Sequence, residues 1–196
     1  MAVTTVMLCG VGGQGTILAA DVLAKVVAAA GLDVKLSEVH GMAQRGGSVD
    51  TVVRFGDQVF APITDPGGAD HLVAFEMIEA ARCLPFLSEE GRLLVNARTI
   101  EPLPVLIGAF PAPEGVEAAL EEQGAIFLDA EALACQAGSP KSANVVLMGA
   151  LSTGLEFPVD LWREVIASRV PPKTTDANLR AFELGRAACD QGVCEL

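Results

Sequence analysis

A glycine-rich turn is the feature of this sequence best suited to bind a ligand. Residues 10–15 read G-V-G-G-Q-G and stand between an apolar run, Val3–Cys9, and an alanine-rich helical pattern, Thr16–Ala30. Glycine permits positive φ and a close approach of helix and strand. The first helical amides then point outward without backbone partners, where the helix dipole also favours a phosphate or carboxylate. We predict an anion site formed by Gly10, Gly12, Gly13, Gln14 and Gly15.

The same spacing fits the G-x-G-x-x-G fingerprint of dinucleotide-binding folds. That fingerprint also needs an acidic residue about 20 positions later, at the tip of the second strand. Asp33 begins the expected second strand, Val34–Val39, and Glu38, rather late in it, is the only residue placed to hold a ribose. Binding of NAD or a flavin is therefore one alternative, and close packing of the glycines without a ligand is another.

A second group of chemically capable residues lies in the loop Ser37–Val49. In a doubly wound sheet this loop and the glycine turn should share one edge, so we expect them to form one site. Arg45 can bind a phosphate or carboxylate through two hydrogen bonds, because small neighbours leave its guanidinium room. It can instead satisfy loop carbonyls or contact another subunit. The site residues predicted in this loop are Gln44, Arg45, Gly46 and Gly47.

No catalytic constellation and no metal site are expected within the chain. Glu38 and His40 would share a strand face, but two ligands cannot build a zinc or iron site, and the other histidine, His71, begins a different strand. Cys9 would lie in a buried strand, where a thiol is normally inert, so a nucleophilic Cys9–His40 pair is not favoured.

The composition indicates a folded acidic protein. Of the 196 residues 51% are hydrophobic, and the formal net charge of −12 argues against nucleic acid or an anionic membrane as partner. No apolar run approaches the roughly 18 residues that cross a bilayer, and no basic residue precedes Lys25, so neither a membrane span nor a secretion signal is expected. A reduced, cytoplasmic protein is indicated by scattered cysteines without a C-x-x-C pair: Cys9, Cys83, Cys135, Cys189 and Cys194.

The elements that must position these residues alternate between strand and helix. The helix at 16–30 has one narrow polar stripe, so nearly all of its surface should be buried against sheet or partner. Ser48–Phe55 and Gln58–Ile63 alternate and predict a hairpin turning at Gly56-Asp57. Further strands are expected at 71–75, 92–96, 105–110 and 125–129, and further helices at 77–87, 114–123, 130–137, 143–155, 159–168 and from about 174 toward Cys189.

These elements predict an α/β fold, a single Rossmann-like three-layer domain over residues 1–196. Its sheet should be mostly parallel, with a β-hairpin insertion and a helical C-terminal part at residues 143–192. The high apolar content and the nearly all-apolar first helix also indicate a surface that needs cover, so the isolated chain should form a homodimer.

Several separated motifs resemble the gamma-type domain of the 2-oxoacid:ferredoxin oxidoreductase family, and the match spans nearly the whole chain. They are the glycine turn, E-V-H-G-M-A-Q-R-G-G-S-V at 38–49, F-E-M-I-E-A-A-R at 75–82 and A-N-V-V-L-M-G-A-L at 143–151. Within the family, H-G-M-A-Q-R-G-G most resembles the small (beta) subunits of the indolepyruvate type, and N-L-R-A-F-E-L-G at 178–185 also fits. The proline-rich segment Glu101–Pro113 cannot be matched.

The resemblance implies a small subunit, inactive alone, of an enzyme that oxidatively decarboxylates an aryl pyruvate. Coenzyme A would take the acyl group as co-substrate, and ferredoxin would take the electrons through a large partner subunit. Thiamine diphosphate, magnesium and the [4Fe-4S] clusters would belong to that partner, so this chain would bind no cofactor itself. The glycine turn and Arg45 would help to position coenzyme A, and the choice of 2-oxoacid would depend on the partner's pocket.

Two other classes of function stay open. One is a free-standing oxidoreductase that binds NAD or a flavin at the glycine turn, with Glu38 on the ribose. The other is an assembly protein that binds no ligand.

Overall fold

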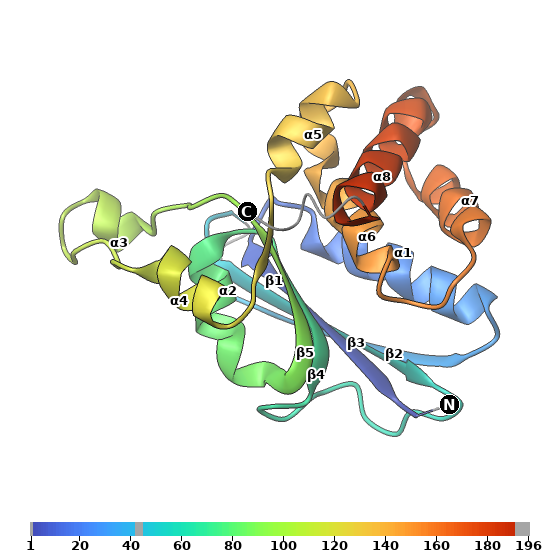
Figure 1. The fold of residues 1–196 in the computed structure, drawn as a ribbon, viewed down its shortest axis with the longest axis horizontal. Helices are drawn as coiled ribbons and strands as arrows, with labels where there is room; N and C mark the ends of the chain where they lie inside the picture. The colour runs from blue at the N-terminus through green and yellow to red at the C-terminus, as the bar shows by residue number, and fades with distance from the viewer. Residues whose placement is uncertain (1, 42–44, 191–196) are drawn as a thin grey trace.

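The computed structural model describes residues 2–41 and 45–190 and is built around a six-stranded mixed sheet (Figure 1). The strand order is β2-β3-β1-β4-β5-β6. Strands β1, β4, β5 and β6 are parallel, whereas β3 runs antiparallel to both of its neighbours. The predicted fold class is confirmed. The strands are β1 Thr4–Val11, β2 Asp33–His40, β3 Ser48–Gly56, β4 Ala69–Ala74, β5 Leu87–Asn96 and β6 Ile126–Leu128.

Helices cover both faces of this sheet and give the domain three layers (Figure 1). Helices α1, α5, α6, α7 and α8 pack over one face, and α2 and α4 pack over the other. Parallel strands covered on both sides read as continuous apolar runs, and β1 does so over residues 6–11, V-M-L-C-G-V. The helices are α1 Thr16–Ala29, α2 Met77–Cys83, α3 Leu103–Leu106, α4 Val116–Glu122, α5 Ala130–Gln136, α6 Ala143–Ser152, α7 Val159–Arg169 and α8 Thr175–Asp190.

Three 3₁₀ turns complete the described elements. They are η1 Leu84–Phe86, η2 Pro140–Ser142 and η3 Pro172–Thr174. None of the helices in the described ranges has both the length and the apolar character that a membrane span requires.

The hairpin is present but lies elsewhere than predicted. Ser48–Phe55 is a strand, β3, but its hairpin partner is β2, across a connection at residues 41–47. Gln58–Ile63 forms no strand, so that prediction is wrong. Both edges of β3 are occupied, by β2 and by β1, and no edge is left for a third strand.

Side chains hold residues 58–63 in place of ladder hydrogen bonds. The guanidinium of Arg54 donates to the carbonyls of Ala61 (3.1 Å) and Ile63 (2.8 Å). The carboxylate of Asp33 accepts from the amide of Val59 (2.8 Å). The alternating pattern of this segment therefore reflects contacts with the end of the sheet, not membership of it.

The predicted strand at 105–110 is also wrong, because the chain there forms the short helix α3 followed by a turn. Amides of Leu106 and Ile107 donate back to the carbonyls of Pro102 and Leu103. Proline is well tolerated in the first turn of a helix, where its missing amide needs no partner. The short apolar run alone could not distinguish a strand from such a turn.

Helices α6 and α8 cross at very close range, and a glycine on each makes this possible. A Cβ on Gly149 would collide with the carbonyl oxygen of Phe182, and a Cβ on Gly185 would collide with that of Val146. The motifs at 143–151 and 178–185 are therefore two halves of one helix contact. Beside this contact, in the larger of the two core clusters, Trp162 of α7 stacks on Phe182 of α8.

Candidate functional site

The structure joins the glycine turn directly to the loop that carries Arg45. The amide of Gly12 donates to the carbonyl of Gly47 (2.8 Å), and the amide of Gly46 donates to the carbonyl of Gly12 (3.4 Å). The register continues this contact, since Val11 at the end of β1 pairs with Ser48 at the start of β3. The expected shared edge is therefore present. Predicted site residue Gln44 lies outside the described residues.

The glycines of the turn have different reasons to be glycine. A Cβ on Gly10 would come within 2.8 Å of the Cβ of Phe75, and a Cβ on Gly15 would lie 2.7 Å from the side-chain nitrogen of Asn144. Close packing explains Gly10, whereas Gly15, with φ of 85°, has a left-handed backbone conformation that favours glycine. Gly13, with φ of 105°, has open space where its Cβ would be, so it leaves room beside the turn.

Gln14 closes the turn with both ends of its amide. Its Oε1 accepts from the amide of Val11 (2.7 Å), and its Nε2 donates to the carbonyl of Phe75 (2.9 Å). Helix α1 then starts after Gly15 without a side-chain cap and without an acidic residue in its first turn. The outward amides of α1 are thus a suitable place for an anion, whereas Gln14 has the structural task of fixing the turn.

A cavity of about 590 Å³, which we call the cationic cavity, opens beside the turn. It lies at the carboxyl ends of β1, β4 and β5, the edge at which α/β folds bind ligands. Three cationic side chains, those of Arg45, Arg98 and Lys141, line the cavity together with one carboxylate, that of Glu131. Within the described part of the chain Arg98 pairs with Glu131, whereas Arg45 and Lys141 form no ion pair. The residues that line it are Gly12, Gly13, Gln14, Arg45, Phe75, Asn96, Arg98, Ile100, Glu131, Pro140, Lys141, Ala143 and Leu147.

A buried amide organises the wall of the cationic cavity. The Nδ2 of Asn96 donates to the carbonyl of Phe75 (3.1 Å) and to Oε2 of Glu131 (2.9 Å), and its Oδ1 accepts from the amide of Ala130. Glu131 in turn accepts from Arg98 (2.7 Å). The sequence analysis missed Arg98, Lys141 and Asn96. A signal for two of them was present, because Asn96 ends the strand predicted at 92–96 and Arg98 follows it, at the edge where α/β folds bind ligands.

Glu76, directly after Phe75, connects this wall to helix α2. Its buried carboxylate accepts from the amides of Ile78 and Glu79 and so caps α2, and it also accepts from the amide of Ile100 (3.3 Å). Burial raises the pKa of Glu76, while the hydrogen bonds from the three amides oppose that shift.

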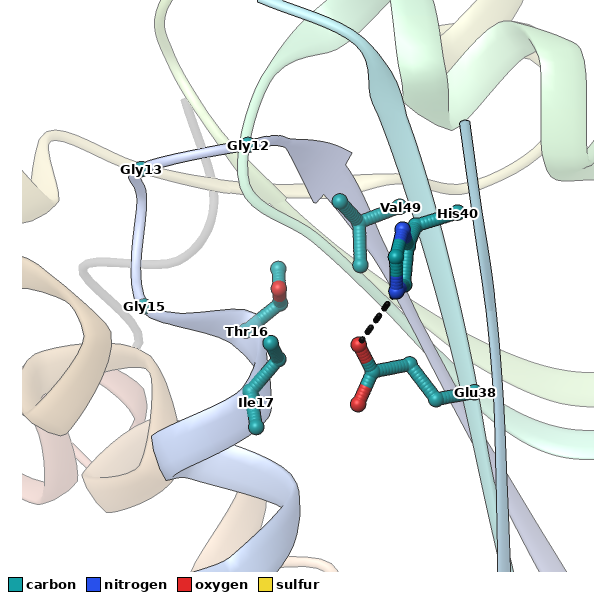
Figure 2. A pocket seen from close by; sticks show the side chains of 8 residues that line it. All are labelled: Gly12, Gly13, Gly15, Thr16, Ile17, Glu38, His40 and Val49. Atoms are coloured by element: carbon teal, nitrogen blue, oxygen red, sulfur yellow. Dashed lines mark ion pairs between the residues drawn. The ribbon is translucent and has the colours of Figure 1, made fainter. Parts of the chain in front are cut away.

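A second cavity of about 490 Å³, which we call the Glu38 cavity, lies on the other side of the turn (Figure 2). Glu38 and His40 point into it from β2 and approach each other, with 3.7 Å between Oε1 and Nε2. They share a face, as the strand period predicts. The cavity is lined by Gly12, Gly13, Gly15, Thr16, Ile17, Glu38, His40 and Val49.

The cysteine considered as a nucleophile lies on the opposite face of the sheet from His40. The register pairs Cys9 with Asp50 and Asp50 with Val39, so Cys9 faces the side of Val39. Its thiol donates to the carbonyl of Glu79 (3.5 Å). Hydrogen bonding with Cys83 and burial raise the pKa of Cys9 well above its usual value, which keeps the thiol protonated.

The donor set of the described residues does not fit a metal or cluster. Within residues 2–41 and 45–190, no three side chains of His, Cys, Asp or Glu converge on a point where they could bind an ion. The chemistry supported by this part of the chain is recognition of an anion by the cationic cavity, and of a hydrogen-bonding group by the Glu38 cavity.

Comparison with known proteins extends over nearly the whole chain. Residues 5–188 match the family described as pyruvate ferredoxin/flavodoxin oxidoreductase. The indolepyruvate oxidoreductase subunit IorB of Thermococcus kodakarensis is 43% identical over 193 residues, and that of Pyrococcus horikoshii is 42% identical; each alignment covers 95% of this chain and 96% of the relative. The crystal structure of pyruvate oxidoreductase subunit PORC from Thermotoga maritima superposes with a TM-score of 0.71 at 25% identity, covering 94% of this chain and 96% of that one.

Proposed function

This chain belongs to the pyruvate ferredoxin/flavodoxin oxidoreductase family, and from that premise we propose that it is the small subunit of an indolepyruvate-type 2-oxoacid oxidoreductase. In the proposed reaction the 2-oxoacid loses carbon dioxide, coenzyme A takes the acyl group and ferredoxin takes the electrons. The proposal of an aryl pyruvate as substrate is supported by relatives at 42–43% identity whose names contain indolepyruvate and subunit.

The large partner subunit would hold the thiamine diphosphate, magnesium and iron-sulfur clusters that supply decarboxylation and electron transfer. The proposal that the metal and the clusters belong to the partner is supported by the described residues of this chain, among which no three His, Cys, Asp or Glu side chains converge. The task of this chain is to bind and orient coenzyme A and to complete the site from its side.

The cationic cavity is the observation that carries this proposal. Arg45, Arg98 and Lys141 converge there beside the uncapped start of α1, in a chain whose formal net charge is −12. A concentration of positive charge on an acidic protein favours an anionic ligand, and guanidinium groups suit phosphate oxygens. Coenzyme A is the proposed reactant that carries phosphates. Glu131, which accepts from Arg98, keeps that side chain directed along the wall.

Replacement of Arg45 by alanine in the assembled enzyme tests this role. Loss of a charge-assisted hydrogen bond should raise the KM for coenzyme A about 10- to 150-fold, or about 1.5–3 kcal/mol, while the KM for the 2-oxoacid changes little. Steady-state kinetics with each substrate varied in turn measures both effects. Arg45→Lys should raise the KM for coenzyme A less than Arg45→Ala does, because lysine keeps the positive charge.

The matched control is Arg163→Ala, which removes an exposed arginine that pairs with Glu183 and Asp160 on helices away from the cavity. It should leave coenzyme A kinetics unchanged. Unchanged kinetics and assembly in Arg45→Ala would remove Arg45 from the site and favour an assembly protein without a ligand. Weaker assembly alone, seen by sizing of the mixed subunits, would assign the loop to the subunit interface.

The Glu38 cavity favours one second candidate, a nucleotide-binding oxidoreductase. Glu38 reaches the space beside Gly12 and Gly13 even though β3 separates its strand from β1, and a carboxylate there can accept from ribose hydroxyls. Titration of the isolated chain with NAD(H) and FAD tests this function. Micromolar binding that is lost in Glu38→Gln would favour it, and no binding would reject it.

A further inference from the structure

An exposed apolar projection, residues 101–114, stands beside the candidate site, and we call it the apolar arm. Its sequence, E-P-L-P-V-L-I-G-A-F-P-A-P-E, has no charge between its two end residues. Between 64% and 69% of the surface of four large side chains is exposed, and no other stretch of the described chain exposes so many so closely together. They are Leu103, Leu106, Ile107 and Phe110.

The apolar arm is locally ordered but lies outside the core. Helix α3 and the turn after it are closed by hydrogen bonds within the arm, such as those from Leu106 to Pro102 and from Phe110 to Pro104. Figure 1 shows α3 projecting beyond α2 and α4, away from the sheet. Four prolines restrict its backbone, so the arm is preformed and a partner need not order it.

The base of the arm is part of the cavity wall. Arg98 and Ile100 line the cationic cavity, and the arm begins at the next residue. This base is fixed by hydrogen bonds from the amide of Met77 to the carbonyl of Arg98 (2.8 Å) and from the amide of Ile100 to Glu76. A protein that covers the arm therefore stands beside the cationic cavity.

The charge around the arm disfavours a second copy of this chain as its occupant. Residues 99–140 contain seven acidic residues and no lysine or arginine. In a two-fold contact the same surface meets itself, so the acidic group of Glu101, Glu114 and the neighbouring Glu117 would face the same acidic group on the other copy. Like charges placed against each other are unfavourable, whereas an apolar groove with a basic rim on a different protein is complementary.

We propose that the apolar arm is the element on which the large subunit docks, with its apolar side chains entering a groove that lysine or arginine residues border. This inference rests on the function proposed above. Docking there places the partner against Arg98 and Ile100, so that the cationic cavity becomes enclosed between the two subunits. Coenzyme A bound in it would then lie at the interface where the partner performs the chemistry.

The test is assembly of the full-length chain with the purified large subunit of the indolepyruvate-type enzyme. The double variant Leu106→Glu/Ile107→Glu should weaken assembly at least about 30-fold, as expected for buried interface anchors. Phe60→Glu/Ile63→Glu, a matched change of two exposed apolar residues at another place, should assemble normally. Assembly is measured by titration with a labelled large subunit, and the unfolding curve of each isolated variant should match that of the parent chain.

A charge variant gives a second measurement that leaves the apolar side chains intact. Glu101→Lys/Glu114→Lys should weaken assembly most strongly at low salt, because it opposes the basic rim. Normal assembly of both arm variants would overturn the proposal, and so would a Leu106→Glu/Ile107→Glu effect confined to self-association of the isolated chain. An inactive wild-type assembly would overturn the proposed function, whereas an active, tight assembly of the arm variants would overturn only the docking.

Discussion

Gln14 shows how a residue in a ligand-binding pattern can have a structural task. The spacing of the glycine turn predicts that Gln14 faces a ligand, but both ends of its amide connect the end of β1 to Phe75. The same side chain explains Gly10, since a Cβ there would meet its Oε1 at 2.7 Å. The turn is thus held rigid from within, and Arg45, Arg98 and Lys141 are left to recognise the anion.

His71 is the residue that should make stability depend on pH. Burial, and then the charge of Arg92, lower the pKa of His71 below its usual value, and Asp70 opposes them less. Its buried Nδ1 has no hydrogen-bond partner among the described residues. Because the unfolded chain then binds more protons than the folded one, stability should fall as the pH drops from about 6.5 toward the folded pKa.

His71→Gln should remove this part of the pH dependence. The slope of unfolding free energy against pH should flatten between about pH 6.5 and the folded pKa. Over that window the variant should avoid a total loss of about 1.4 kcal/mol for each unit by which the folded pKa is depressed. Urea unfolding at several pH values measures it. The chain has two histidines, and His40→Gln, which changes the exposed one, is the control. Equal slopes in the parent chain and His71→Gln would contradict the assignment.

At the scale of elements, the crossing of α6 and α8 depends on its two glycines. Gly149→Ala or Gly185→Ala should destabilise the protein by about 1–3 kcal/mol, although alanine is the better helix former by about 1 kcal/mol. The reason is collision with the carbonyls of Phe182 and Val146, which belong to backbone that cannot move aside. Chemical denaturation gives the change in unfolding free energy.

Gly41→Ala makes the same chemical change where a Cβ meets nothing within 4 Å. It should stay within about 0.5 kcal/mol of the parent protein. A neutral result for Gly149→Ala would mean that the helices separate without cost, and the crossing would then not explain why both late motifs contain glycine.

Elements with a clear period were predictable from the sequence, and elements fixed by distant side chains were not. The apolar run at 3–9 correctly predicted strand β1, and the helix predicted at 159–168 is α7. The segment 58–63 alternates like a strand, yet its backbone is held by Arg54 and Asp33, whose positions only the folded sheet reveals. For the same reason the sequence indicated Arg45 but not Lys141, which reaches the site from η2 across the fold.

At the scale of the whole molecule, we predict that the isolated chain is colourless, inactive toward 2-oxoacids and dimeric. Strand β2 is an open edge of the sheet with exposed Leu36 and Val39, and such an edge readily pairs with a copy of itself. Analytical ultracentrifugation should show the dimer, and Val39→Lys should favour the monomer. A brown preparation that contains iron and oxidises 2-oxoacids would contradict this prediction.

The position of β3 between β2 and β1 has a consequence for the order in which the protein folds. The β2–β3 hairpin closes over a short connection, on a timescale of microseconds, and β1 lies nearby in sequence. The parallel strands β4, β5 and β6 need longer crossovers, which form more slowly. During synthesis the glycine turn and Arg45 can therefore assemble before Arg98 and Lys141 have left the ribosome. The cationic cavity lacks its full set of cations until Lys141 has been synthesised, so a shorter nascent chain does not carry the complete anion site.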